Sequence, residues 1–145
     1  MRDTQGMLTY LAENPVVDGS VGVLGYCMSG RYVVAAAGRF PDQIAAVASL
    51  YGVGIVTDQS DSPHLLADKI RAELYLGFAE TDSYVSDDVV PKLQSTLAEH
   101  NVDHVIETHA GTEHGFCFPG RGPAYVETAA EKVWEIVFDL YRRRL

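Results

Sequence analysis

The sequence predicts an α/β fold in which a parallel sheet carries helices on both of its faces. Helical and strand-like segments alternate along the 145 residues, in the order helix, strand, helix, strand, strand, helix, strand, helix. Crossover connections between parallel strands produce this order. The apolar run over 44–51 is typical of a strand that is covered on both faces. A second segment, 21–30, joins an apolar strand to an alanine-rich helix through a tight turn that contains a cysteine.

Apolar spacing, together with residues that start or stop helices, gives the expected elements. The first helix ends before Pro15, and Asp18-Gly19 is expected to form a turn. Strands are expected over 21–24, 44–51, 72–78 and 102–108. Later helices are expected over 31–37, 64–69, 87–100 (capped by Ser86) and 123–144, with a loop over 109–122 before the last one.

Composition is that of one globular domain, residues 1–145, with 47% hydrophobic and 21% charged residues. The net charge of −9, from 20 acidic and 11 basic residues, argues against nucleic acid and anionic membranes as partners. No apolar run reaches membrane-spanning length. Two cysteines make no disulfide framework, and no signal peptide is visible, so we expect a cytoplasmic protein. The basic run Arg142–Arg144 is interpreted as a complement to a helix dipole.

The turn between Leu24 and Arg31 is the most informative part of the chain. Gly25 suits a tight turn because it has no Cβ, and Cys27 follows two residues later. A strand–turn–helix elbow lifts the residue at its apex into open space, and the positive end of the helix dipole favours a thiolate there. We therefore interpret Cys27 as a nucleophile rather than as a buried structural cysteine. The backbone N–H of Met28 is expected to point at the developing oxyanion.

Two further loops are expected beside this elbow, because the carboxyl ends of parallel strands meet at one edge of a sheet. The segment 77–85 contains Asp82, and the segment 109–116 contains His114. The chain order nucleophile, acid, histidine is that of α/β-hydrolases. His114 would accept the thiol proton, and Asp82 would hold the imidazole tautomer. Glu80, two residues before Asp82, is the competing acid.

The remaining histidines and the second cysteine leave other interpretations open. His64, His100 and His104 lie in polar stretches and are expected at the surface. His109, His114 and Cys117 match no standard zinc spacing, so no metal is expected. Cys117 is expected to pack inside the histidine loop. If it lay near Cys27, the two thiols would form a redox pair.

Four motifs taken together resemble the dienelactone hydrolase family, the cysteine-nucleophile branch of the α/β-hydrolase fold. They are Gly25-Tyr26-Cys27-Met28-Ser29-Gly30, Tyr51-Gly52-Val53-Gly54, Thr81-Asp82-Ser83-Tyr84-Val85 and Glu113-His114-Gly115-Phe116. The resemblance covers nearly the whole chain. It implies a hydrolase of small-molecule carboxylic esters or lactones that uses Cys27 as nucleophile, His114 as base and Asp82 as acid, with no cofactor. It also implies a substrate pocket, which we expect to be lined by Tyr26, Tyr51, Tyr84, Phe116 and Arg121.

The resemblance further implies that the chain corresponds to the C-terminal portion of the family's domain, without its N-terminal strands. In the family, those strands supply the second oxyanion donor and a glutamate that helps control the thiol. An elbow strand without its neighbour has an unpaired edge, so we expect either that the chain is half of a longer protein or that it covers this edge by self-association, most simply as a two-fold dimer. Two alternatives stay open: a catalytically silent or weakly active module that oligomerises or binds, and a thiol-redox protein that uses Cys27 and Cys117.

Overall fold

The computed structural model describes residues 1–17 and 19–145, so Asp18 of the expected Asp18-Gly19 turn lies outside the described residues. Its four strands form one parallel sheet in the order β1-β2-β3-β4. The strands are β1 (Val21–Tyr26), β2 (Ile44–Leu50), β3 (Glu73–Thr81) and β4 (His104–Glu113). The α-helices are α1 (Arg2–Glu13), α2 (Met28–Arg39), α3 (Val89–Glu99) and α4 (Glu127–Arg144), and the 3₁₀ helices are η1 (Pro63–Lys69) and η2 (Pro119–Ala124).

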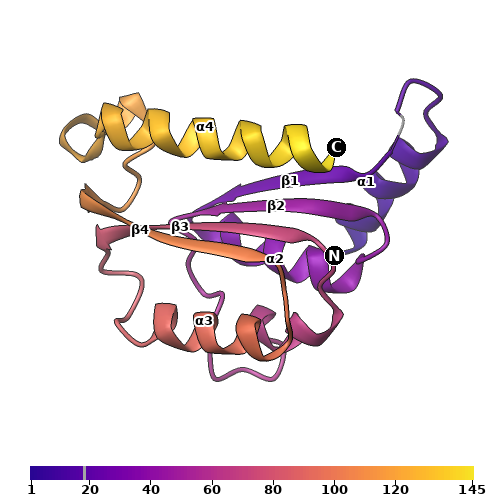
Figure 1. Cartoon of the computed structure of the whole chain (residues 1–145), viewed down its shortest axis with the longest axis horizontal. Coiled ribbons are helices and arrows are strands. Elements are labelled where there is room, and N and C mark those ends of the chain that lie inside the picture. Colours follow the sequence, from indigo (N-terminus) through magenta and orange to yellow (C-terminus); the bar gives the residue numbers. More distant parts are fainter. Residues whose placement is uncertain (18) are drawn as a thin grey trace.

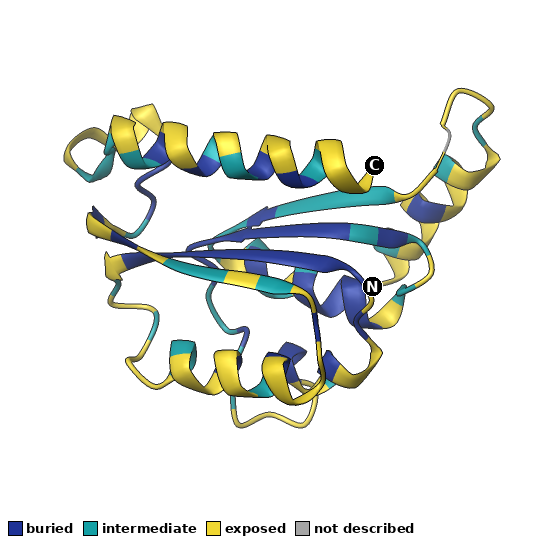
Figure 2. Ribbon diagram, viewed as in Figure 1, coloured by how far each residue is buried: buried dark blue, intermediate teal, exposed yellow. Residues whose placement is uncertain are grey.

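The helices cover both faces of the sheet, as predicted. Helix α4 runs along one face, while α2 and α3 lie on the other (Figure 1). Each face has its own apolar cluster: Val34, Leu74, Leu76 and Leu93 belong to the α2/α3 side, and Val133, Val137 and Leu140 of α4 belong to the other. Strand β2 is buried between them along nearly its whole length (Figure 2). The apolar run over 44–51 is therefore confirmed as a strand covered on both faces.

Several boundaries differ from the predicted ones. Helix α2 begins at Met28, three residues before the expected start, because the elbow turns directly into the helix. Strand β4 continues to Glu113, so the first part of the predicted loop over 109–122 is strand. The last α-helix begins at Glu127 rather than Pro123, since Pro123 lies within η2. Ser86 does not cap α3, whose N-cap residue is Asp88.

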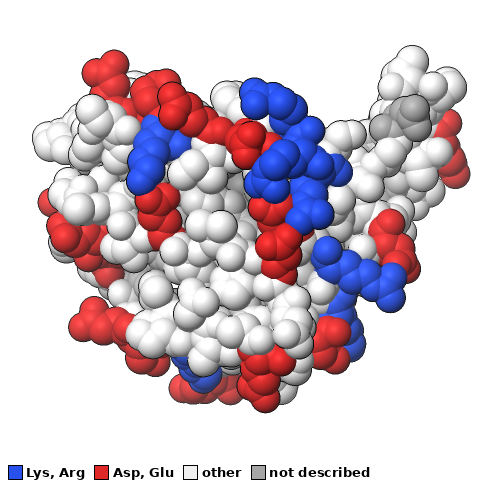
Figure 3. Space-filling view, in the orientation of Figure 1, with Lys and Arg blue, Asp and Glu red and all other residues white. Residues whose placement is uncertain are grey.

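The basic run at the end of α4 forms ion pairs with neighbouring carboxylates. Arg143 donates two hydrogen bonds of 2.8 Å to the carboxylate of Glu73, and Arg144 bonds to Glu73 and Asp103. The side chain of Glu73 is 9% exposed, and its hydrogen bonds to Arg143 are the main reason that its pKa is lowered. In Figure 3 the Lys and Arg atoms near the C-terminal end of α4 accordingly adjoin Asp and Glu atoms. The run ties α4 to the first residue of β3.

Helix α1 lies beside the amino-terminal end of β1, away from the elbow (Figure 1). Leu8 is its buried residue, whereas Met7 and Tyr10 on the same helix are exposed. None of the helices in the described part of the chain combines the length and the apolar character that crossing a bilayer requires.

Helix α2 packs closely against the end of β2 and the loop that follows it, and this contact sets the distance between the start of α2 and the sheet. A Cβ added to Gly30 would lie 2.5 Å from the Cα of Gly52 and 2.5 Å from Oγ of Ser49. Neither neighbour is the far end of a flexible side chain, so any side chain here would push the helix away from the sheet.

We therefore expect Gly30→Ala to lower the free energy of unfolding by about 1–3 kcal/mol, the usual cost of overpacking a tight core. Urea unfolding measures the change. Gly6→Ala is the matched control, because a Cβ on Gly6 in α1 meets no atom within 4 Å. That variant should be neutral or more stable by up to about 1 kcal/mol. A Gly30→Ala protein as stable as the wild type would contradict the close packing.

Candidate active site

Cys27 stands at the apex of the elbow, between the last residue of β1 and the first residue of α2. Its φ of 50° and ψ of −122° are sparsely populated for a residue other than glycine. The strained backbone is held by hydrogen bonds: the N–H of Cys27 donates to the carbonyl of Leu50, and its carbonyl accepts from Gly30 and Val53. Cys27 is half-buried and lines a cavity.

Ser29 adds a second restraint to the elbow. Its hydroxyl accepts a hydrogen bond of 2.7 Å from the N–H of Tyr26 and donates one of 2.7 Å to the carbonyl of Tyr26. The hydroxyl thereby satisfies polar backbone groups at the end of β1. A serine near the start of a helix is the sequence signal for such a contact. Met28, the predicted oxyanion donor, is the first residue of α2, where helix N–H groups have no intrahelical partner.

Asp82 and His114 lie in direct contact although they are 32 residues apart in the chain. Nδ1 of His114 lies 2.7 Å from Oδ2 of Asp82, and the other oxygen of Asp82 accepts the N–H of Tyr84 at 2.9 Å. Both side chains are largely covered, with 12% of His114 and 4% of Asp82 exposed. A carboxylate accepts only, so Nδ1 carries the proton and Nε2 is left as the basic nitrogen. Glu80, the competing acid, instead accepts the N–H of Gly111 at 2.8 Å.

One cavity of about 230 Å³ brings most of the predicted residues together. Its wall is largely aromatic, and it is lined by Tyr26, Cys27, Tyr51, Tyr84, His114, Gly115, Phe118 and Arg121. The rings of Tyr51 and Tyr84 lie 5.0 Å and 4.8 Å from the imidazole of His114, on which both pack edge-on. The candidate nucleophile and the candidate base therefore face the same small space.

Phe116 does not line this cavity, so its prediction as a pocket residue is wrong. It is fully buried, and its ring packs between Tyr51 at 5.6 Å and His109 at 5.1 Å. The φ of +91° at Gly115 reverses the chain after His114, and Phe116 points into the core below. Phe118 lines the cavity in its place, with its ring 4.7 Å from that of Tyr26. Sequence reasoning missed Phe118 because nothing in the pattern sets the conformation of this loop.

Arg121 lies at the cavity wall against the backbone of Gly115. A Cβ at Gly115 would be 2.9 Å from Nε of Arg121, so glycine lets the guanidinium lie this close to the backbone of residue 115. Within residues 1–17 and 19–145, no carboxylate lies within ion-pair distance of Arg121. A charge without a partner is thus available at the wall of the cavity.

The other histidines are placed partly as expected. His100 is exposed and His104 is half-buried, but His64 is buried, contrary to prediction. Nδ1 of His64 lies 2.8 Å from Oγ of Ser62, which fixes the loop before η1, and burial lowers the pKa of His64. His109 is buried on β4 against the hydroxyl of Tyr75, at 3.0 Å. Among the described residues, no group of three or more His, Cys, Asp or Glu side chains is arranged to hold a metal ion.

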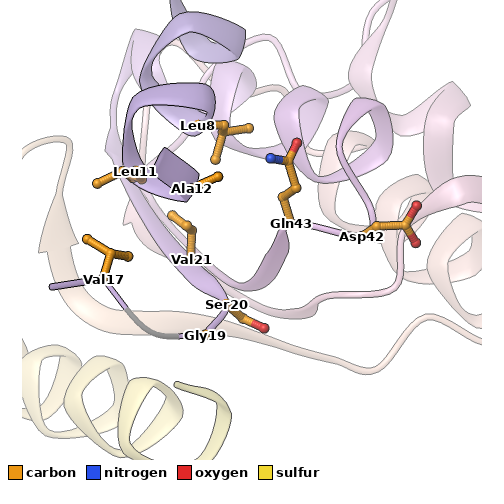
Figure 4. A pocket seen from close by; sticks show the side chains of 9 residues that line it. All are labelled: Leu8, Leu11, Ala12, Val17, Gly19, Ser20, Val21, Asp42 and Gln43. Atoms are coloured by element: carbon orange, nitrogen blue, oxygen red, sulfur yellow. The ribbon is translucent and has the colours of Figure 1, made fainter. Parts of the chain in front are cut away.

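A second cavity, of about 360 Å³, lies at the opposite end of β1 from the elbow (Figure 4). Its walls come from α1, the start of β1 and the segment before β2, and it is lined by Leu8, Leu11, Ala12, Val17, Gly19, Ser20, Val21, Asp42 and Gln43. The described part of this wall contains no histidine or cysteine, and the carboxylate of Asp42 is paired with Arg71. The described wall of this cavity therefore offers no thiol and no imidazole, unlike the wall of the cavity at the elbow.

The fold and this site define an α/β-hydrolase-like protein. The chain belongs to the dienelactone hydrolase family, because the model of that family matches residues 1–145. "Protein usf" of Aquifex pyrophilus is 27% identical over 86% of this chain and 52% of its own length. A Synechocystis protein, provisionally named a carboxymethylenebutenolidase, is 28% identical over 100% of this chain and 59% of its own.

Solved structures show the same fold. A provisionally assigned dienelactone hydrolase from Klebsiella pneumoniae superposes with a TM-score of 0.85 at 20% identity, over 97% of this chain and 59% of the other. The dienelactone hydrolase-like promiscuous phosphotriesterase P91, from metagenomic libraries, superposes with a TM-score of 0.83 at 23% identity, over 99% of this chain and 60% of its own. The chain thus spans between one half and three fifths of the length of these relatives.

The two thiols differ enough in environment to be told apart chemically. Cys117 is 3% exposed, and burial raises its pKa to about 12, whereas Cys27 lines the open cavity. We expect iodoacetamide at neutral pH to alkylate Cys27 first, because a thiolate with access to the reagent is required. Mass spectrometry of proteolytic peptides measures both rates. Cys27→Ala should remove the fast phase and leave Cys117 unlabelled until urea is added. Equal rates in the folded protein would contradict this difference.

Proposed function

We propose that the protein hydrolyses small carboxylic esters or lactones, with Cys27 as nucleophile, His114 as base and Asp82 as the acid that orients the imidazole. The observation that carries the proposal is the 2.7 Å contact between Asp82 and His114 in a site where His114 and Cys27 line one cavity. A nucleophile, a base and a third group that orients the base form the arrangement that covalent acyl transfer needs.

In the first half of the reaction, Nε2 of His114 accepts the thiol proton of Cys27, and the sulfur attacks the carbonyl carbon of the ester. The carbonyl oxygen becomes an oxyanion, which the N–H of Met28 at the start of α2 stabilises. Collapse of this intermediate breaks the bond to the alkoxy oxygen, which takes the proton from His114 and leaves as the alcohol. A lactone opens at the same bond, and its alcohol stays attached to the acyl group.

In the second half, His114 accepts a proton from water as the water attacks the thioester. Collapse of the second tetrahedral intermediate breaks the carbon–sulfur bond, and the thiolate recovers the proton from His114. The products are one carboxylic acid and the free enzyme. Asp82 keeps Nδ1 of His114 protonated throughout and stabilises the imidazolium that forms in each half.

The cavity supports a small substrate with an apolar body. Its volume of about 230 Å³ and its aromatic wall, with Tyr26, Tyr51, Tyr84 and Phe118, suit a short or cyclic acyl group. The guanidinium of Arg121, which has no carboxylate partner among the described residues, favours a substrate that presents a negative group or a hydrogen-bond acceptor at the same wall.

Hydrolysis of p-nitrophenyl acetate tests the proposal. We expect turnover by the wild type to be lost in Cys27→Ala and His114→Ala. Asp82→Asn should reduce it by up to about 10⁴-fold, because an asparagine at this position favours the wrong imidazole tautomer. Asp87→Asn, an exposed carboxylate beyond the same loop, is the matched control and should keep the wild-type rate.

The outcomes also separate the competing functions. A folded wild-type protein with no turnover above the Cys27→Ala background would contradict the hydrolase and favour a binding module. Turnover that survives Cys27→Ala would contradict the assignment of the nucleophile. Loss of two protons from the intact mass on mild oxidation, abolished by Cys117→Ser, would favour the thiol-redox alternative.

We also propose that a second copy of the chain covers the free edge of β1. In the described residues β1 pairs only with β2, and Val21, Val23 and Leu24 are only half-buried. On α4, Phe138 is 59% exposed and stacks on Trp134, with ring centroids 5.8 Å apart. An unpaired edge without charged side chains is a surface to which another strand adds readily.

Light scattering after size-exclusion chromatography tests this association at micromolar concentration. We expect the mass of a dimer, and a monomer for Phe138→Glu, because the new charge would be buried against the second copy. Tyr10→Glu, a comparably exposed aromatic residue on α1, is the control and should leave the dimer intact. A wild-type monomer at every concentration would rule the dimer out.

A further inference from the structure

Strand β4 contains two extra residues just before the candidate catalytic histidine. Ala79 of β3 pairs with His109 of β4, but Thr81 pairs with Glu113, so β3 advances by two residues while β4 advances by four. The extra length forms a bulge around Gly111, whose φ of +71° suits glycine. Bulges at strand ends redirect the side chains that follow them. Here the residue that follows is His114.

Glu80 holds this bulge through both its side chain and its backbone. Its Oε2 accepts the N–H of Gly111 at 2.8 Å, and its own N–H donates to Oγ1 of Thr112 at 3.3 Å. The Thr112 hydroxyl in turn donates to the carbonyl of His109 at 2.7 Å, inside the bulge. Thr112 is 1% exposed, so no water competes for its hydroxyl from outside. The bulge is therefore fixed from the neighbouring strand at two points.

These contacts join the two segments that carry the Asp82–His114 pair. Glu80 lies two residues before Asp82, and Gly111 lies three residues before His114. Without the carboxylate of Glu80, the N–H of Gly111 loses its partner, and a glycine has the widest choice of backbone conformations. Of the two ties to β3, only the hydrogen bond from the backbone N–H of Glu80 to Thr112 then remains to hold the bulge before His114.

We infer that Glu80 is a positioning residue, which places His114 against Asp82 by fixing the bulge of β4. The carboxylate of Glu80 acts through the N–H of Gly111, and its backbone N–H acts through the hydroxyl of Thr112. The expected effect of Glu80 on the rate rests on the proposed function, whereas its expected effect on the geometry of His114 does not.

Three variants test this inference. Glu80→Ala removes the acceptor, Glu80→Gln keeps an amide oxygen that still accepts the N–H of Gly111, and Glu99→Ala is the control at an exposed glutamate on α3. For p-nitrophenyl acetate we expect Glu80→Ala to lower kcat by about 10- to 100-fold, the loss expected for a base displaced by roughly 1 Å. KM should stay the same, because Glu80 does not line the cavity with Cys27. Glu80→Gln and Glu99→Ala should keep most of the wild-type rate.

Proton NMR gives a readout that needs no turnover. The Nδ1 proton of His114 is protected from solvent and hydrogen-bonded to Asp82, so it should give a resolved low-field signal in the wild type and in Glu80→Gln. The signal should be weakened or lost in Glu80→Ala, and His114→Ala identifies it. If Glu80→Ala does not fold, as judged by circular dichroism, Thr112→Val breaks the second tie with little change of shape and should give the same two losses.

The results separate this inference from the proposed function. A wild type without turnover contradicts the hydrolase, while the NMR signal still decides the role of Glu80. Unchanged kcat and an unchanged signal in Glu80→Ala would overturn the positioning role with the hydrolase intact. Equal losses in Glu80→Ala and Glu80→Gln would overturn it as well, because the charge of Glu80 would then matter rather than its hold on Gly111.

Discussion

The strained backbone at Cys27 is the constraint on which the rest of the site depends. A residue other than glycine at a φ of 50° costs about 1–3 kcal/mol, and it persists only where the surroundings hold it in place. Here the surroundings are the carbonyl of Leu50, the N–H of Val53 and the hydroxyl of Ser29 two residues on. The close contact of Gly30 with Gly52 lets α2 begin directly at the elbow. The thiol is therefore directed by contacts among β1, α2 and the loop after β2.

The parallel arrangement of the sheet then assembles the other two residues. Asp82 follows β3 and His114 follows β4, and both strands end at the same edge as the elbow. Neighbouring strands place two such loops close together, but the sheet alone does not set their register. The bulge before His114 and the ties from Glu80 supply that register. The 2.7 Å contact between Asp82 and His114 thus depends on two features: the sheet order, which makes β3 and β4 neighbours, and the bulge in β4.

Much of the fold was predictable because apolar spacing reports burial directly. The covered run of β2, the helices on both faces and the elbow at Cys27 all follow from such patterns. The predictions that were wrong concern features without a periodic signal. Phe116 ends the Glu113-His114-Gly115-Phe116 motif, but the turn at Gly115 directs its ring into the core. His64 lies in a polar stretch, yet it is buried, and the hydroxyl of Ser62 gives its ring a hydrogen-bond partner there. The extension of β4 through the bulge was missed because a bulge interrupts the alternation that identifies a strand.

The placement of the elbow on β1 has a further consequence for how the protein works. In the described residues β1 is an edge strand, so the candidate nucleophile is carried by the strand of the sheet that has a neighbour on only one side. The Asp82–His114 pair, by contrast, is carried by β3 and β4, which share a long register and the ties at the bulge. The proposed second copy on the free edge of β1 would therefore contact the strand that leads into Tyr26 and Cys27, rather than the strands that carry Asp82 and His114. The pair itself is held by contacts within this chain. We therefore expect the proposed association to influence the elbow, while the Asp82–His114 pair stays in place with or without a second copy.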